Sequence, residues 1–255
     1  MGKVVAIANQ KGGVGKTTTA VNLSAELALL GKAVLLCDFD PQGNATSGLG
    51  VDKKRVENTV YSMLLGECAP ADALVHTPVP GLELIPTDNN LAGASIELIA
   101  EADRTTRLKD RLHPLLHRFD YIFIDCPPSL ELLTLNALNA ADTILVPIQC
   151  EFFALEGLSQ LMNSIRQIKK LYNPPLDIEG VLLTMYDSRL NLTMEVAQEI
   201  KRFFGNKVYA TVIPRNVRLS EAPSHGLPVG MYDKYSRGAE SYRAVAAEFL
   251  ARAEG

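Results

Sequence analysis

The sequence has no tryptophan, few cysteines and no long apolar run. Its 255 residues include four cysteines and four histidines. The cysteines are scattered without a C-x-x-C pair, and no cysteine and histidine cluster has zinc spacing, so we expect neither a disulfide framework nor a structural metal. No apolar run approaches the ~20 residues that a membrane-spanning helix needs. These absences exclude disulfide scaffolds, zinc modules and integral membrane proteins.

The N-terminus lacks the plan of a signal peptide, because a strand pattern begins by Lys3. We therefore expect a cytoplasmic protein in which residues 1–255 form one domain, with no separate DNA-reading domain before it. The formal net charge of −4 argues against strong overall attraction to nucleic acid. That average hides a stretch from Arg189 to Arg218 that holds six basic residues against two acidic ones.

Apolar runs alternate with helix-period runs along the whole chain. Strands are expected at 3–8, 33–38, 82–85, 121–125, 143–148, 180–184 and 208–213. Helices are expected at 16–30, 91–101, 104–117, 130–140, 155–171, 193–204 and 239–252. The strands are rich in Val, Ile and Leu without strict alternation, which is typical of a parallel sheet buried on both faces. The pattern predicts an α/β fold, a doubly wound, mostly parallel sheet with helices on both faces.

A glycine-rich loop joins the first strand to the first helix. It reads N-Q-K-G-G-V-G-K-T-T from Asn9 to Thr18. In this position glycines let the backbone N–H groups surround a polyphosphate, and the helix N-terminus adds positive potential. Lys16 would reach the β- and γ-phosphates, and the Thr17 hydroxyl would bind Mg²⁺. The loop departs from G-x-x-x-x-G-K-[ST], because Gln10 replaces the first glycine and a second lysine, Lys11, follows it.

Acidic residues end two of the expected strands. Asp38 and Asp40 follow 33–38 in the run D-F-D-P-Q-G-N, and Asp125 ends 121–125 before C-P-P. Ligands of open α/β sheets collect at the carboxyl ends of strands, so all three carboxylates are expected to face the nucleotide. Asp125 would hold Mg²⁺, through water, together with Thr17. Of Asp38 and Asp40, one would orient the attacking water or bind the water shell of the metal, and the other would brace the loop.

These motifs together resemble the ParA/MinD family of deviant Walker A ATPases, and most closely its small chromosomal, Soj-type ParA members. The resemblance continues through L-T-M-Y-D-S-R at 183–189 and V-I-P-R-N-V-R-L-S-E-A-P at 212–223. It implies that Lys11 crosses a dimer interface to the partner's ATP, that Gly12 lies at the subunit contact, and that Asp40 is the hydrolytic aspartate. The nucleotide-binding positions that the motif and the resemblance give are Lys11, Gly12, Gly13, Val14, Gly15, Lys16, Thr17, Thr18, Met185, Pro214 and Asn216.

The resemblance also implies partners. Arg189 and Arg218 become DNA-contacting residues, and the basic stretch adds Arg215, Lys201 and Arg202 as candidates. We expect an ATP-bridged homodimer that binds double-stranded DNA without sequence preference, because no recognition helix is visible. A ParB-type centromere-binding protein would stimulate slow ATP hydrolysis and release the dimer from the nucleoid.

Two other readings fit the phosphate loop. A MinD-like division-site ATPase would need a C-terminal amphipathic membrane anchor, whereas the apolar stripe of 239–252 favours packing on the domain, so no membrane partner is expected. An ATP-dependent ligase or a reductase subunit shares the loop, but a reductase needs paired interface cysteines, and no second cysteine matches Cys126. A GTPase is disfavoured because the N-K-x-D run is absent.

Overall fold

A seven-stranded sheet runs through the computed structural model, which describes residues 1–129, 131–151 and 154–254. The strands are β1 (Lys3–Ile7), β2 (Val34–Asp38), β3 (Val75–His76), β4 (Leu82–Ile85), β5 (Tyr121–Asp125), β6 (Thr143–Gln149) and β7 (Asp177–Thr184). Their spatial order is β3-β4-β2-β5-β1-β6-β7, and every pair is parallel except β3 with β4. The expected doubly wound, mostly parallel sheet is confirmed.

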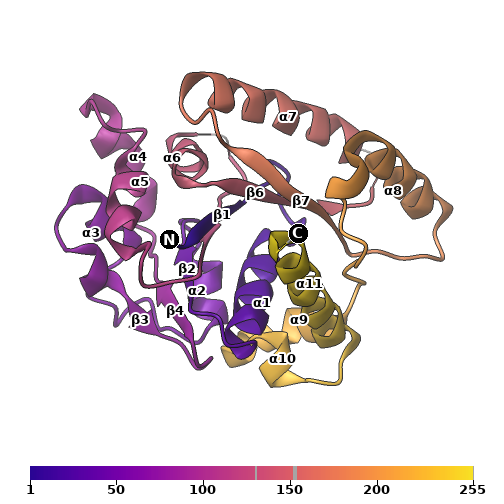
Figure 1. Ribbon diagram of the computed structural model, residues 1–255. Coiled ribbons are helices and arrows are strands. Elements are labelled where there is room, and N and C mark those ends of the chain that lie inside the picture. The colour runs from indigo at the N-terminus through magenta and orange to yellow at the C-terminus, as the bar shows by residue number, and fades with distance from the viewer. Residues whose placement is uncertain (130, 152–153, 255) are drawn as a thin grey trace.

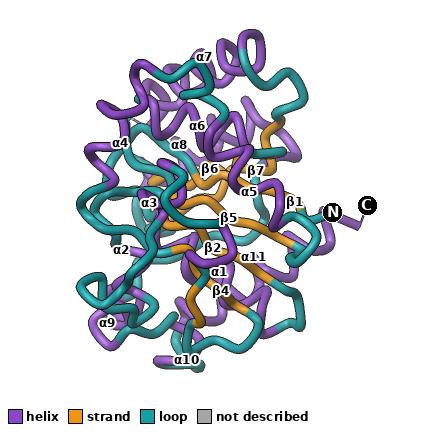
Figure 2. Tube along the Cα trace, turned by 90° about the vertical axis from the view of Figure 1, so that its left-hand side faces the viewer, coloured by secondary structure: helices purple, strands orange, loops and turns teal. Residues whose placement is uncertain are grey.

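Helices cover both faces of this sheet (Figures 1 and 2). One face carries α3 (Val60–Leu65), α4 (Leu91–Glu97), α5 (Arg107–Leu112), α6 (Leu132–Ala140), α7 (Ala154–Leu171) and α8 (Asn191–Phe204). The other carries α1 (Lys16–Leu29), α2 (Asn44–Gly48), α9 (Val217–Glu221), α10 (Val229–Tyr232) and α11 (Arg237–Glu254). Short 3₁₀ turns are η1 (Pro70–Ala73), η2 (Leu98–Ala100), η3 (His113–Leu115), η4 (Gly205–Lys207) and η5 (Ala222–His225).

Strand β5 shows why its sequence is almost wholly apolar. Ile122 and Ile124 face the core under α3 to α8, while Phe123 faces the core under α1 and α11. Successive strand residues point to opposite faces, so a strand covered on both sides needs apolar residues at every position.

The register of the central strands brings the expected site together. Ile7 at the end of β1 is paired with Asp125 at the end of β5, and Asp125 is paired with Asp38 at the end of β2. The start of the phosphate loop and the two strand-end carboxylates therefore lie side by side at the carboxyl ends of the central strands.

The predicted strand at 208–213 is wrong. The segment runs beside β7 with only an isolated bridge between Val181 and Val208, and it returns to β7 where the Ile213 N–H donates to Leu183. Between these points the carboxylate of Glu248 accepts the N–H groups of Ala210 and Thr211 at 2.8 and 2.9 Å. This carboxylate comes from α11, and it replaces the ladder that a seventh parallel strand would have used.

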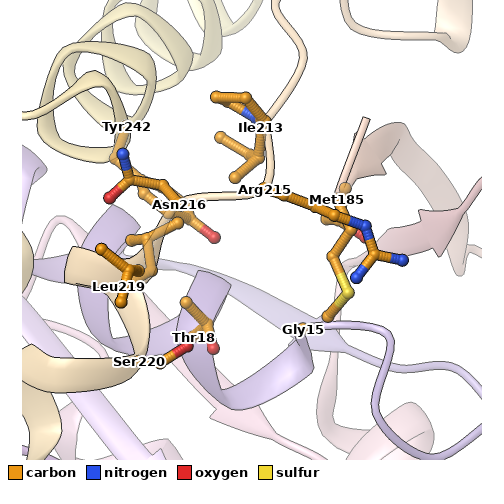
Figure 3. A pocket seen from close by; sticks show the side chains of 12 residues that line it. Gly15, Thr18, Met185, Ile213, Arg215, Asn216, Leu219, Ser220 and Tyr242 are labelled. Carbon is orange, nitrogen blue, oxygen red and sulfur yellow. The ribbon is translucent and has the colours of Figure 1, made fainter. Parts of the chain in front are cut away.

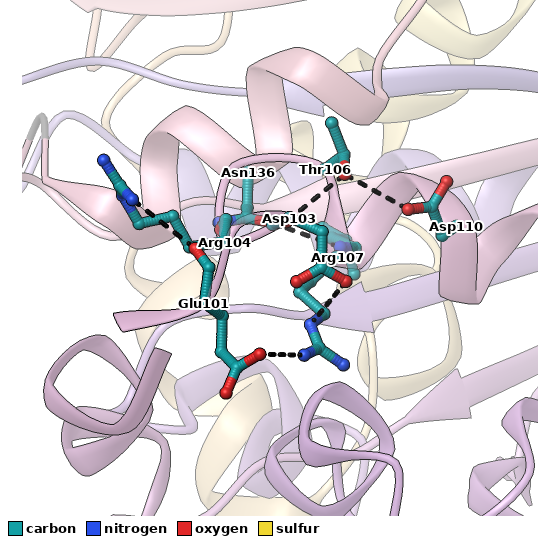
Figure 4. Close-up of polar contacts among 8 residues, drawn as sticks. Glu101, Asp103, Arg104, Thr106, Arg107, Asp110 and Asn136 are labelled. Carbon is teal, nitrogen blue, oxygen red and sulfur yellow. Dashed lines mark hydrogen bonds and ion pairs between the residues drawn. The ribbon is translucent and has the colours of Figure 1, made fainter. Parts of the chain in front are cut away.

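Other boundaries also differ from those expected. The helices expected at 91–101 and 104–117 are shorter, as α4 with η2 and α5 with η3. The loop between them is held by polar contacts: Arg107 pairs with Glu101 and Asp103, and Asn136 of α6 donates to the Arg104 carbonyl at 2.7 Å (Figure 4). Helices α2 and α3 and strand β3 were not expected. Residue 130, the start of one expected helix, and residue 255 lie outside the described residues.

The last helix, α11, packs on the domain as expected. Tyr242, Val245 and Phe249 are buried, and the Tyr242 hydroxyl lies 3.1 Å from Thr19 Oγ1 of α1. Phe249 makes an edge contact with Tyr121, with ring centroids 5.1 Å apart. Among the described helices, none combines the length and apolar character required to cross a bilayer.

We predict that Phe249→Ala lowers the free energy of unfolding by about 3–5 kcal/mol, because it leaves a cavity where α11 meets the sheet. Urea unfolding followed by circular dichroism measures the change. Ile96→Ala is the control, since Ile96 is 76% exposed and its loss should cost under about 0.5 kcal/mol. An equal, small effect of both variants would contradict the packing of α11.

Candidate nucleotide site and adjoining basic surface

The glycine-rich loop is shaped by residues on both sides of it. Gly13 and Gly15 have φ of 72° and 88°, a region that side chains rarely adopt, and α1 begins directly after Gly15, at Lys16. The loop is held to the sheet where Thr184 at the end of β7 donates to the Val14 carbonyl at 2.7 Å. Asn9 donates from its amide to Pro147 of β6 at 2.7 Å. The backbone cradle is thus preformed.

The two lysines of the loop face different surroundings. Lys16 is buried, and its Nζ donates to the Lys11 carbonyl at 3.2 Å. Burial lowers the pKa of Lys16, while Asp125, Cys126 and Asp40 act in the opposite direction. Lys11 is half-exposed, and its Nζ pairs with Glu151 at 2.7 Å. Only Lys16 therefore lies among the carboxylates of the site.

Asp38 and Asp40 do different work, which the sequence left open. Asp38 is fully buried and accepts both the backbone N–H and the hydroxyl of Thr46, at 2.7 and 2.6 Å. Burial raises the pKa of Asp38 to about 6, and the Thr46 bonds oppose that rise. Asp40 Oδ1 accepts the Gln42 N–H at 3.0 Å, while no donor of the described residues reaches its Oδ2. Asp38 is therefore the brace, and Asp40 keeps an oxygen for another ligand.

Asp125 is buried, and neither carboxylate oxygen has a hydrogen bond of ordinary length and angle within the described residues, although the Thr17 side chain lies beside it. Burial raises its pKa well above the usual range, Asp38 adds to the rise, and the nearby Thr17 side chain and Lys16 counter it. The charged form of this carboxyl is therefore costly unless a cation or donor binds it. The pair of Asp125 and Thr17 fits Mg²⁺, which takes one or two protein oxygens beside phosphates and water.

A cavity of about 280 Å³ opens beside the phosphate loop (Figure 3). Gly15 and Thr18 form its base, and Met185, Pro214 and Asn216 lie on its walls with Ile213, Leu219 and Tyr242. Met185, Pro214 and Asn216, which the resemblance gave as nucleotide-binding, thus come together from two segments. The wall is apolar with a few polar groups, which suits a planar base.

Met185 is held in an unusual backbone conformation. Its φ of 49° is the only positive value outside glycine among the described residues. The next residue fixes it, because the Tyr186 N–H donates to Ile213 at 2.9 Å and Tyr186 forms a bridge with Pro214. Strain of this kind persists only where its surroundings impose it, and it gathers at binding sites.

The basic residues do not form a single cluster. Arg189 and Arg215 line one basin outside the cavity. Arg218 lies on α9 and pairs with Glu221 at 2.7 Å and Asp233 at 3.2 Å. Lys201 and Arg202 lie on α8, where Arg202 borders a different hollow beside Phe203.

Sequence reasoning missed several residues around the site. Thr184, Thr46 and Glu151 position the loop residues described above, yet each is an ordinary polar residue at the end of a strand or in a short helix. Tyr242 and Arg237 come from α11, far along the chain, and no local motif marks them. Cys126 is fully buried, so its thiol is not presented at the surface as an interface cluster would require.

The first strand of a mostly parallel sheet leads through a glycine-rich loop into a helix that begins at a buried lysine, Lys16. An aspartate without an ordinary hydrogen bond among the described residues, Asp125, ends the adjacent strand. These features together define a P-loop nucleotide hydrolase.

Comparisons with known proteins narrow this class. A family model described as an AAA domain matches residues 2–178. The sporulation initiation inhibitor protein Soj of Bacillus subtilis is 58% identical over 98% of this chain and 99% of its own length. The chromosome partitioning protein ParA of Caulobacter vibrioides is 52% identical over 98% and 94%. A structure of cobyrinic acid a,c-diamide synthase from Mycobacterium smegmatis, with bound ADP and magnesium, is 39% identical with a TM-score of 0.87, over 100% and 96%.

The chain belongs to the Soj/ParA family of chromosome-partitioning ATPases. The synthase represents the ligase alternative, and its identity to this chain is lower than that of either partitioning protein.

We predict that Asp125→Asn stabilises the nucleotide-free chain by about 1–3 kcal/mol, because an amide has no charged form whose burial opposes folding. The same variant should lose the further stabilisation that ATP with Mg²⁺ gives the wild type. Thermal unfolding with and without these ligands measures both effects. Asp72→Asn, which changes an exposed acid elsewhere, should alter neither. A variant that keeps the full magnesium-dependent stabilisation would contradict the metal role.

Proposed function

We propose that the chain is a chromosome-partitioning ATPase whose ATP-bound form pairs into a homodimer, binds DNA through its backbone and releases it on hydrolysis. ATP and Mg²⁺ are the ligands of the site. The glycine loop and Lys16 bind the phosphates, Thr17 and Asp125 hold the magnesium, and Met185, Pro214 and Asn216 surround the base. When bound, Mg²⁺ neutralises charge on the phosphates that hydrolysis redistributes.

Asp40 positions the attacking water. Its buried carboxylate keeps Oδ2 available among the described residues, while Asp38 and Thr46 anchor the loop that carries it. Beyond Lys16, the described part of the site contains no second buried cation to stabilise the charge of the transition state. A site of this kind hydrolyses ATP slowly, and a partner that adjusts it gains control over the rate. The partner we propose is a ParB-type centromere-binding protein.

The orientation of Lys11 is the observation that carries the dimer. Its amine pairs with Glu151 instead of lying among the site carboxylates, so it does not serve the nucleotide of its own chain, and it would leave Glu151 for a nucleotide held by another chain. Gly12 supports this proposal. A Cβ built on Gly12 meets nothing within 4 Å, and its φ is not positive, so the fold of a single chain does not require glycine there. A partner chain packed closely against the loop would require glycine at this position.

The DNA surface consists of Arg189, Arg215 and Arg218, with Lys201 and Arg202 on α8 as outer contacts. These side chains are exposed, with 86% of Arg189 and 61% of Arg215 accessible. A dimer doubles the number of phosphate contacts, and affinity for DNA rises steeply with that number. ATP thereby controls DNA binding by controlling dimerisation, which places the protein on the nucleoid in its ATP state.

The MinD-like alternative lacks comparable support. The apolar residues of α11 that would enter a membrane, Tyr242, Val245 and Phe249, are packed against the sheet and α1.

We predict that the wild type binds duplex DNA of unrelated sequence with ATP, and only weakly with ADP or no nucleotide. Lys11→Ala should lose ATP-dependent binding, because it removes the dimer contact, and Arg189→Ala with Arg215→Ala should lose it while still dimerising. Fluorescence anisotropy with light scattering separates the two effects.

The control for charge is Arg118→Ala, which removes an exposed arginine just before β5, at the opposite edge of the sheet. DNA binding that is indifferent to nucleotide, or equally reduced in the control, would overturn the proposal.

A further inference from the structure

A basin of about 700 Å³ lies directly against the nucleotide cavity. The two hollows share Pro214 and Arg215 as a common wall. The basin is bounded by the loop after β7, by the segment that includes Arg215, and by the first turn of α11. Segments that are distant in sequence thus meet next to the site that holds the nucleotide.

Three guanidinium groups border this basin, one from each segment: Arg189, Arg215 and Arg237. Arg237 is exposed, and no carboxylate of the described residues lies within ion-pair distance of it. A cation in the first turn of a helix is unfavourable to that helix, so helix stability does not explain this arginine. Its charge is left for a ligand that comes from outside.

Arg189 already has an anion, supplied by its own chain. Nε and Nη2 donate to the two oxygens of Asp187 at 2.9 and 2.7 Å, and the Arg189 backbone N–H donates at 3.1 Å. This two-pronged geometry is the one that a guanidinium offers to a phosphate. The bonds from Arg189 lower the pKa of Asp187 to about 2, so its carboxylate stays charged at neutral pH. The arginine side chain is 86% exposed, and an exchange of partners there costs little.

We infer that the basin seats DNA phosphates, that Arg237 is its third guanidinium, and that an incoming phosphate displaces the Asp187 carboxylate from Arg189. This inference rests on the proposed function and specifies the groups that carry its DNA step. It assigns a binding role to Arg237 and a competing role to Asp187.

The charges around the basin explain why one chain binds DNA weakly. Three guanidiniums face Asp187 and Glu240, and Glu151 lies 4.0 Å from Arg215. Together with Lys11, which also pairs with Glu151, these groups sum to only +1 in a single chain, and the whole sequence has a net charge of −4. A phosphate at Arg189 must displace Asp187, and one at Arg215 competes with Glu151, so useful affinity requires the contacts of two chains at once. Asp187 thereby sharpens the dependence of DNA binding on dimerisation.

Anisotropy of a labelled duplex, titrated with the ATP-bound full-length protein at several NaCl concentrations, tests the inference. Arg237→Ala should weaken binding about tenfold and reduce the salt slope by about 2, one contact from each chain. Asp187→Asn should tighten binding about threefold to fivefold and raise the weak binding of the ADP form. Light scattering and basal ATP hydrolysis should match the wild type for both variants.

Glu240→Gln is the matched control. It removes one negative charge from the same basin, as Asp187→Asn does, but the carboxylate that pairs with Arg189 is that of Asp187 and stays in place. Wild-type affinity of Arg237→Ala would overturn the inference, as would equal tightening by Glu240→Gln and Asp187→Asn. Arg189→Ala in the same series separates failure of the proposed DNA surface from failure of the inference about Arg237 and Asp187. If Arg189→Ala binds DNA normally, the proposed DNA surface fails. If it binds weakly while Arg237→Ala does not, only the inference fails.

Discussion

The account depends on the difference between two lysines five residues apart on one loop. Lys16 is buried beside the strand-end carboxylates, and the Lys11 amine is directed to Glu151. A phosphate site in one chain needs the first amine for its own nucleotide. We propose that the second reaches the nucleotide of another chain, which would make that second chain part of the chemistry.

The strand register brings the acidic residues of the site next to the phosphate loop. Because Ile7, Asp125 and Asp38 end adjacent parallel strands, the phosphate loop, the proposed magnesium ligand Asp125 and the bracing residue Asp38 lie side by side. Asp125 remains unpaired in the nucleotide-free chain, at a cost in stability. Mg²⁺ bound there would relieve this cost, so the ligand would stabilise the folded chain. The shared wall at Pro214 and Arg215 then sets the nucleotide directly beside the surface proposed for DNA.

The sequence predicted the sheet, its parallel character and the phosphate loop, since these follow from apolar runs and glycine spacing within short windows. It placed Met185, Pro214 and Asn216 in one cavity only through family resemblance. The strand expected at 208–213 failed because a carboxylate from α11, Glu248, captures its backbone donors, and no local pattern encodes a partner 38 residues away. Arg237 was missed for the same reason. No motif surrounds it in the sequence, and its proposed role depends on Arg189 and Arg215, which lie on the same basin.

The most direct test of the claim that Lys11 of each chain acts on the nucleotide of the other is complementation between two variants. Neither variant should hydrolyse ATP alone. Lys11→Ala lacks the amine that reaches the partner's nucleotide, and Lys16→Ala lacks the amine that binds the nucleotide of its own chain. In a mixed dimer, the nucleotide of the Lys11→Ala chain has its own Lys16 and the partner's Lys11. The account predicts that ATP hydrolysis appears on mixing the two variants. Activity that stays at the sum of the separate proteins, or a Lys11→Ala protein that is active alone, would contradict it.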